Sequence, residues 1–392
     1  MSRRLLFIIL GVATIEILAR VLLSIDLVYD RVIRPYYFFD ETAERLRWIR
    51  NHKNKKSTTY YTFDKFDPTK GWITRSDIKN MTVFKNKILN TNSKGLRGKA
   101  EYTYEKQKDK VRILIFGDSF TFGDEVSDTD TYPAQLQNML PQAEVINFAV
   151  HGYGHDQMLI LLREEGVRYN PDIIILGYIK ADNFRNTLNF KDYSKPKFKL
   201  INNQLVLTNS PVPSPETLLK QEIYKSKLLD MLTILYKRVL ANNDSYNNDS
   251  DRITEAILDE FVNTTLEIGA ILVFVNLAVD FPNARPEAGN DKFFGYFCNT
   301  KGLHCTSLLR YFSTKVNKHE KLFEYEGHWN EKGNLLAAEG IYDYLIDNNL
   351  VPKSSENVLD RLSPWKEDLL RAAPKSMLAK RHVSSIIYWR DE

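Results

Sequence analysis

Apolar residues along this chain form short runs that alternate with segments of helical spacing. Runs rich in Val, Ile, Leu and Phe predict strands at residues 111–117, 144–149, 172–178 and 270–277. Between them, apolar residues recur every three or four positions, which predicts helices at about 130–140, 155–168 and 251–268. Alternation of this kind is typical of a largely parallel sheet with helices on both faces. The pattern therefore predicts an α/β fold.

Other parts of the chain do not follow this alternation. Residues 61–110 have the pattern of irregular strands that precede and cover the main domain, which we place at 61–350. Residues 179–250 form a long insertion, helical near 215–241, which ends in an Asn- and Asp-rich run typical of a flexible loop. The charged tail at 351–392 is compatible with a docked helix or with a partner-binding segment, and its sequence does not choose between them.

The N-terminal segment is the most apolar part of the chain. Residues 5–25 are mostly apolar and follow Arg3 and Arg4. At 1.5 Å per residue, a helix over this stretch is about 31 Å long, enough to cross the hydrocarbon core of a bilayer. Glu16 and Arg20 interrupt it, but residues four apart share a helix face and can pair.

We interpret residues 5–25 as an uncleaved signal anchor, because no convincing small-residue cleavage site follows them. By the positive-inside rule, residues 1–4 are then a cytoplasmic tail and the rest of a single-pass protein lies outside the cytoplasmic membrane. Residues 26–60, charged and aromatic, are a juxtamembrane stalk whose aromatic residues either meet the lipid interface or pack on the main domain. A buried or interfacial amphipathic helix is the alternative for 5–25, and the Glu–Arg pair favours it.

Charge and cysteine content narrow the classes of function. The net charge is only +4, from 54 basic and 50 acidic residues, so we expect no nucleic-acid partner. The sequence contains no C-x-x-C pattern, and we expect neither a metal nor a cofactor. Cys298 and Cys305 lie in a loop-like stretch and would form a disulfide in an extracytoplasmic domain or remain free thiols otherwise; their spacing does not decide.

Chemistry is expected where the first core strand ends, at Gly117-Asp-Ser119. A strand that stops at a tight turn before a helix can hold a serine hydroxyl at the rim of a sheet, next to backbone N–H groups that stabilise an oxyanion. Gly, Asp and Ser are also ordinary turn and capping residues, so the tripeptide alone does not establish a nucleophile.

A base for Ser119 is expected at His328, in a loop that precedes a segment of helical pattern. A nucleophilic serine needs a base, and the imidazole needs an acid that fixes its tautomer and stabilises its cation. Glu326, two residues before His328, is placed to be that acid, and Glu324 is a weaker candidate. Of the seven histidines, His328 alone has this acid–Gly–His setting.

Two further strand ends belong to the expected site. The run at 144–149 leads into a Gly-rich turn containing Gly152, and the run at 172–178 is followed by Asp182 and Asn183. In a parallel sheet the carboxyl ends of the strands meet at one edge, where open α/β sheets bind their ligands. We therefore expect these residues near Ser119.

Together, these segments resemble the SGNH, or GDSL-type, hydrolase superfamily over roughly residues 60–348. Phe116–Gly123 looks like the block that carries the nucleophile, and Asn147–Gly152 looks like the block whose glycine donates to the oxyanion hole. Gly327–Asn330 looks like the block with the catalytic histidine. Gly71-Trp72 and Asn92–Gly98 resemble a subset of the superfamily that carries an N-terminal membrane helix.

The resemblance implies a flavodoxin-like three-layer sandwich with a central parallel sheet. It also implies a triad with Ser119 and His328, whose acid we assign to Glu326, and an oxyanion hole that includes the N–H groups of Ser119 and Gly152; we expect Asn183 to add its amide. At the acid position relatives have Asp where this chain has Glu326, which is longer by one methylene but can still accept from the imidazole.

The third block departs further from the family. It usually ends in Gly-Asn-Asp, whose Asn donates to the oxyanion, whereas Asp182 occupies that position here. An ionised carboxylate cannot donate a hydrogen bond. Either Asn183 reaches in from the next position, or the hole relies on the N–H groups of Ser119 and Gly152 alone. We expect Asp182 to turn away, toward Lys180 or Arg185.

The sequence thus predicts a membrane-anchored serine esterase or O-acyltransferase. Its expected substrate is an ester-bearing small molecule or glycan, with an O-acetyl group on an extracytoplasmic glycan favoured by location and family. The alternative is a non-catalytic protein of the same fold that binds or assembles surface glycan, and Asp182 is the feature in its favour. A cytoplasmic lipase-like enzyme is a third, weaker possibility.

Overall fold

The computed structural model describes residues 3–33, 40–52, 61–240, 243–277, 292–317, 320–324 and 327–352. Glu326, the aromatic part of the predicted stalk and the tail from residue 353 lie outside the described residues.

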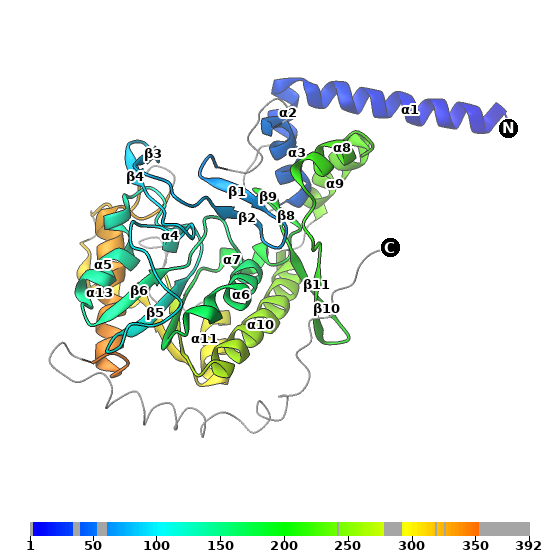
Figure 1. The fold of residues 1–392 in the computed structure, drawn as a ribbon. Helices are drawn as coiled ribbons and strands as arrows, with labels where there is room; N and C mark the ends of the chain where they lie inside the picture. The colour runs from blue at the N-terminus through cyan, green and yellow to red at the C-terminus, as the bar shows by residue number, and fades with distance from the viewer. Residues whose placement is uncertain are drawn as a thin grey trace.

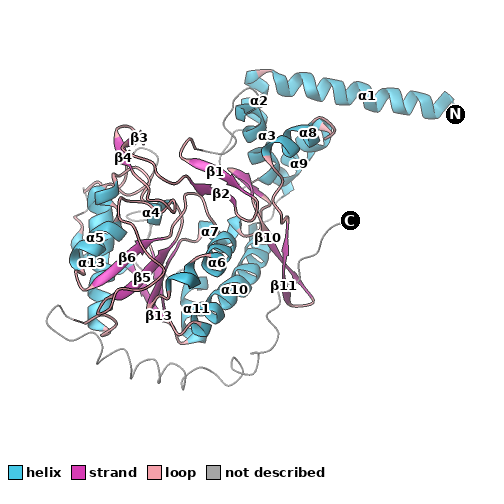
Figure 2. Cartoon of the chain, viewed as in Figure 1, coloured by secondary structure: helices cyan, strands magenta, loops and turns pink. Residues whose placement is uncertain are grey.

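A five-stranded parallel sheet forms the centre of the molecule (Figures 1 and 2). From edge to edge the strands are β6 (Ala143–Asn147), β5 (Val111–Phe116), β7 (Ile173–Tyr178), β12 (Ile271–Asn276) and β13 (His304–Ser307). Every adjacent pair is parallel. Numbered along the chain the order is 2-1-3-4-5, the flavodoxin-like order. The predicted fold class is therefore confirmed.

Both faces of the sheet are covered, which explains why β5, β7 and β12 are continuous apolar runs. Along β5, Ile113 and Ile115 pack in one core cluster, whereas Leu114 and Phe116 pack in the other. The first face is covered by α5 (Tyr132–Met139), α12 (Leu308–Lys315) and α13 (Glu331–Asp347). The second is covered by α6 (His155–Glu164), α10 (Asn243–Glu267) and α11 (Lys292–Lys301).

The segment at 61–110, called here the cover segment, precedes the sheet, and its first part packs near the carboxyl edge of the sheet. It contains two short antiparallel hairpins, β1 (Asp64–Asp67) with β2 (Gly71–Thr74) and β3 (Met81–Val83) with β4 (Lys87–Leu89). Trp72 on β2 is fully buried and donates from Nε1 to the carbonyl of His151 at 2.8 Å. The cover segment is therefore joined directly to the Gly-rich turn of the predicted site.

The insertion after β7 holds more structure than its pattern predicts. It contains α7 (Ala181–Arg185), β8 (Phe190–Lys191) with β9 (Tyr193–Ser194), β10 (Lys197–Ile201) with β11 (Gln204–Thr208), α8 (Pro215–Glu222) and α9 (Lys227–Leu240).

The predicted flexible loop at the end of this insertion is wrong. The Asn- and Asp-rich run from residue 243 is the first part of α10. Adding a residue to an existing helix costs far less than starting one, so the strongly helical segment after Ser250 extends backward through residues of poor propensity.

The N-terminal helices stand apart from the sheet. α1 (Arg3–Ser24) projects away from the body of the molecule (Figure 1), and it is long and apolar enough to cross a membrane. It is followed by α2 (Asp26–Ile33) and α3 (Glu41–His52). Trp48 on α3 packs against Phe190 and Tyr193 of the β8–β9 hairpin. The part of the predicted stalk that forms α3 is thus docked on the insertion.

The two cysteines do not lie in a loop. Cys298 is on α11 and Cys305 is on the edge strand β13, and they are joined in a disulfide. The bond links a covering helix to the sheet.

Candidate active site

Ser119 is placed by a turn that only glycine permits. β5 ends at Phe116, and Ser119 is the first residue of the short helix α4 (Ser119–Phe122). A Cβ on Gly117 would lie 2.0 Å from Thr121 Oγ1, so no other residue fits there. Asp118 is fully buried, and its carboxylate accepts from the backbone N–H of Phe120 at 3.0 Å. The predicted strand–turn–helix junction therefore positions Ser119 at the carboxyl edge of the sheet.

His328 lies against this serine although 209 residues separate them in sequence. Its Nε2 is 2.8 Å from Ser119 Oγ. The histidine loop is held by its own backbone, since Glu324 N–H donates to His328 O at 2.8 Å. Asn330 then caps α13 by accepting from Gly333 N–H at 3.0 Å. The structure thus brings together the two residues that the sequence predicts as nucleophile and base.

The acid predicted to orient His328 cannot be placed, because Glu326 lies outside the described residues. His328 Nδ1 is buried and has no hydrogen-bond partner among the described residues. A carboxylate that the sequence analysis missed lies next to it: Glu125 Oε2 is 3.6 Å from Nδ1 and accepts from the backbone N–H of His328 at 3.0 Å. The weaker candidate, Glu324, contributes its backbone N–H to the histidine loop.

Glu125 reaches His328 because the chain turns back at the end of α4. Gly123 ends that helix in the left-handed conformation with φ +93°, and Asp124 and Glu125 follow at once. Glu125 itself has φ +66°, a backbone conformation that non-glycine residues rarely adopt. Such strain persists where the surroundings fix it, and it is concentrated at functional sites. Two acids directly after the nucleophile's helix were the available signal in the sequence.

Arg97, from the cover segment, holds this acidic loop from behind. Its buried guanidinium donates to the carbonyls of Phe122, Gly123 and Val126 at 2.6–2.8 Å. Its Nε donates to Asp128 Oδ1 at 3.0 Å. One side chain therefore fixes both ends of the loop that carries Asp124 and Glu125.

Backbone N–H groups are available for an oxyanion. Within the described part of the chain, neither Ser119 N–H nor Gly152 N–H donates a hydrogen bond to another group. Gly152 has φ +75°, and a Cβ there would lie 3.1 Å from Asp192 Oδ2 and 3.3 Å from Trp72 Cζ2. The turn that presents Gly152 therefore requires glycine, and both predicted backbone donors remain candidates.

The two polar residues after β7 are engaged elsewhere. Asn183 Nδ2 donates to Asp251 Oδ1 on α10 at 2.8 Å, so a charged acceptor competes with any oxyanion for this amide. Asp182 Oδ1 accepts from Arg185 Nη1 at 2.6 Å, and Asp118 Oδ2 accepts from the same nitrogen at 2.9 Å. Arg185 is one of the two partners expected for Asp182. The amide of Asn183 has a second hydrogen, so its role in the oxyanion hole stays a prediction beside the two backbone N–H groups.

A buried group of acids surrounds a second histidine beside the site. Asp124 Oδ2 is 2.5 Å from His151 Nδ1 and 4.0 Å from His328 Nε2. Burial lowers the pKa of His151, but the hydrogen-bonded Asp124 carboxylate, with Asp64 and Asp192, outweighs it and raises the pKa overall. Burial, with the nearby Asp124 and Asp192 charges, raises the pKa of Asp64 to about 8 in spite of His151.

These shifts predict a fold that loses stability as the pH rises. Because the folded-state pKa of Asp64 is raised, the folded protein binds more protons than the unfolded chain between about pH 4 and pH 8, and stability falls across that window. The raised pKa of His151 acts in the same direction. We expect Asp64→Asn to raise the melting temperature at pH 8.5 by about 2 °C or more, the shift for roughly 1 kcal/mol in a large domain, with little change at pH 5.

Thermal unfolding in detergent at both pH values measures this effect. Asp77→Asn, an exposed acid of the same segment, is the matched control and should change neither melting temperature. An equal rise in melting temperature for Asp64→Asn at pH 5 and at pH 8.5 would contradict the raised pKa of Asp64.

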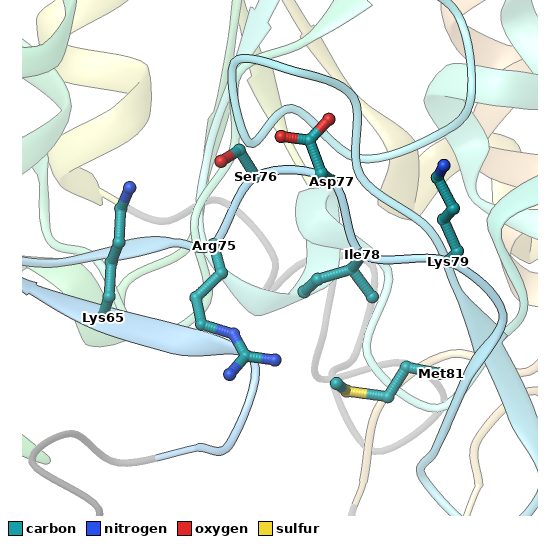
Figure 3. A pocket seen from close by; sticks show the side chains of 7 residues that line it. All are labelled: Lys65, Arg75, Ser76, Asp77, Ile78, Lys79 and Met81. Carbon is teal, nitrogen blue, oxygen red and sulfur yellow. The ribbon is translucent and has the colours of Figure 1, made fainter.

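A basic hollow of about 460 Å³ lies on the cover segment (Figure 3). Lys65, Arg75 and Lys79 project along its border. Ile78, also in its lining, packs in one cluster with Phe122 and Ala149, from the segments that carry Ser119 and Gly152. The lining also contains the acid Asp77, so the hollow is bordered by three basic side chains and one acidic side chain.

Comparison with known proteins identifies relatives by structure. None of the protein-family models matches the chain, and no curated protein matches it. Among solved structures, a member of the lipolytic G-D-S-L family from Veillonella parvula is 11% identical with a TM-score of 0.36, and the match covers 60% of this chain and 97% of that one. The psychrotrophic esterase EstA from Pseudoalteromonas is 14% identical with a TM-score of 0.35, over 61% and 98%. An acetyl xylan esterase, AlAXEase, is 12% identical with a TM-score of 0.35, over 59% and 98%.

The first of these solved structures is thus a member of the lipolytic G-D-S-L family, and the other two are esterases. At these identities and TM-scores the matches carry no information about reaction or substrate. The argument for a function rests instead on the geometry of Ser119 and His328.

Proposed function

We propose that this protein is a serine-dependent ester hydrolase or O-acyltransferase. The observation that carries the proposal is the 2.8 Å contact between Ser119 Oγ and His328 Nε2 at the carboxyl edge of the sheet, next to two unengaged backbone N–H groups. A serine, a base and preorganised donors together are what acyl transfer requires. Covalent labelling of Ser119 by a fluorophosphonate, lost on prior denaturation, tests the proposal.

The reaction follows from these positions. His328 Nε2 takes the hydroxyl proton as Ser119 Oγ attacks the ester carbonyl, and the N–H groups of Ser119 and Gly152 stabilise the oxyanion. When the tetrahedral intermediate collapses, the bond to the leaving alcohol breaks and His328 returns the proton to that oxygen. The acyl-enzyme is then attacked by water in hydrolysis, or by a sugar hydroxyl in transfer, with His328 accepting the proton of the attacking group. The bond between the acyl carbon and Ser119 Oγ then breaks, and His328 returns the proton to Oγ.

The alternative of a non-catalytic glycan-binding protein loses its main argument. Asp182 would destabilise an oxyanion only if its carboxylate were ionised, unpaired and directed at the oxyanion. The two negative charges would then repel by about 4 kcal/mol at roughly 4 Å and an effective dielectric near 20. Instead, Asp182 is bonded to Arg185, and burial raises its pKa well above the ordinary value despite that positive charge. The arrangement therefore favours an active enzyme.

We also propose that α1 crosses the membrane once, with the unit at 61–350 outside. The length and apolar character of α1, Arg3 and Arg4 before it, and the Cys298–Cys305 disulfide support this location. An extracytoplasmic position makes O-acetyl esters of surface glycans the proposed substrate.

An alkaline phosphatase fusion after residue 60 is expected to be active in a bacterial host. Alkaline phosphatase folds only outside the cytoplasm, where its own disulfides form. A fusion of a cytoplasmic reporter at the same position is the control and should be inactive. The reverse pattern would place the catalytic unit inside and favour the lipase-like cytoplasmic enzyme.

A further inference from the structure

The two charged residues that interrupt the apolar stretch of α1 are engaged by the insertion. Glu16 and Arg20 pair with each other at 2.8 Å. Glu16 also accepts from Ser226 Oγ at 2.7 Å and from the backbone N–H groups of Lys227 and Leu228 at 3.0 and 3.1 Å. These are the first N–H groups of α9, which lack partners within that helix. Glu16 therefore caps α9 from outside.

Arg20 engages the preceding part of the same turn. Its Nη2 donates to the carbonyls of Lys225 and Ile223 at 3.0 and 3.4 Å, just after the end of α8. The turn between α8 and α9 thus presents acceptors to the cation and donors to the anion. Glu16 and Arg20 are thus both matched by one turn, which removes much of the cost of burying them in lipid.

The position of Glu16 along α1 places this turn at membrane depth. If the hydrocarbon ended at Glu16, only residues 5–15 would lie within it, about 16 Å of helix at 1.5 Å per residue, roughly half of what a bilayer needs. If α1 spans the hydrocarbon as far as Ser24, Glu16 lies about 12 Å below the point where the helix leaves the hydrocarbon. A span by α1 therefore draws the α8–α9 turn below the lipid surface.

The turn and α9 have the surface that such a position requires. Apolar and aromatic side chains are exposed at the turn and along one side of α9: Ile223 (67%), Tyr224 (88%), Leu229 (63%), Leu232 (49%), Leu235 (41%) and Tyr236 (64%). The spacing of 229, 232 and 236 puts them on one helix face. On the opposite side Ile234 is fully buried, and Arg45 of α3 pairs with Asp230 at 2.5 Å. Asp230 thus faces the protein, and the apolar face of α9 has no cover in the described structure.

We infer that the α8–α9 hairpin is a second membrane element, inserted beside α1 into the leaflet on the catalytic side. The inference rests on the proposed span of α1. Its partner is the acyl region of a phospholipid bilayer, because α9 contacts α1 and the exposed apolar face continues the lipid-facing surface of that helix. Two attachments hold the body more firmly than one flexible stalk, so the edge of the sheet that carries Ser119 is kept at a fixed height and tilt above the lipid.

Depth-dependent quenching tests the inference in the full-length protein. Tyr224→Cys and Leu232→Cys, both at exposed positions, are labelled with a thiol-reactive fluorophore while the native cysteines remain in their disulfide. The protein is reconstituted into phosphatidylcholine–phosphatidylglycerol vesicles containing doxyl-labelled lipid. We expect at least twofold quenching at both sites. Ile201→Cys, an exposed apolar residue on the β10–β11 hairpin, is the matched control and should not be quenched.

A label on Ile8→Cys in α1 separates the two proposals. Quenching at Ile8 without quenching at Tyr224 and Leu232 would leave the span intact and overturn the hairpin insertion. Labels at Tyr224 and Leu232 that are quenched neither by aqueous iodide nor by doxyl-labelled lipid would mean that a second copy of the protein covers this face. That result would also overturn the insertion of the hairpin. No quenching at Ile8 would remove the span and the inference with it.

Discussion

Ser119→Ala is expected to abolish labelling by a fluorophosphonate and to lower the turnover of a p-nitrophenyl ester by at least a thousandfold. Removing the serine of a catalytic triad costs on the order of 10⁶ in rate elsewhere, and the residual rate comes from the oxyanion hole and from binding. We expect a large loss in this protein because Ser119 Oγ is the hydroxyl in contact with His328 Nε2. In the described structure no other hydroxyl takes that position and could replace it as the nucleophile.

Ser313→Ala is the matched control, because that serine is exposed on α12 and bonds only to a carbonyl of its own helix. It should keep both labelling and turnover. Undiminished turnover in purified Ser119→Ala would end the proposed mechanism.

The second large effect is expected at the base and its acid. His328→Ala should be nearly as severe as Ser119→Ala. Glu326→Gln should lower turnover by about a hundredfold or more, since an amide neither fixes the required tautomer nor stabilises the imidazolium. Glu125→Gln should cost about tenfold, because an amide oxygen can still accept from the His328 backbone N–H and only the nearby charge is lost.

Steady-state kinetics of the three variants, with circular dichroism to verify folding, measures this order. A larger loss for Glu125→Gln than for Glu326→Gln would reverse the assignment, and the acid of the triad would then be the residue 3.6 Å from His328 Nδ1.

The core of the fold could be predicted because its strands bury both faces. β5, β6, β7 and β12 are short apolar runs in the sequence, and the order 2-1-3-4-5 follows once the motifs are recognised. β13, with the sequence His-Cys-Thr-Ser, is an edge strand with half-buried side chains and carries no such run. Its position depends on pairing with β12 and on the disulfide, neither of which is visible in local pattern.

The site was predictable to the extent that its residues lie in motifs. Ser119, His328 and Gly152 stand at strand ends or at a helix start, and parallel strands bring such positions to one edge. Glu125 could not be predicted in the same way, because its approach to His328 depends on the left-handed turn at Gly123 and on a positive φ of its own. The engagement of Asn183 by Asp251 depends on a helix that the insertion separates from it by 68 residues.

The contacts of Trp72 and Arg97 determine where the catalytic unit begins. A fragment starting at Val111 would retain every side chain assigned to the reaction. It would lack the indole bonded to the turn that presents Gly152, and the guanidinium that holds the loop of Glu125. We therefore expect the smallest soluble form able to react with an ester to start before the β1–β2 hairpin, about fifty residues upstream of the first core strand.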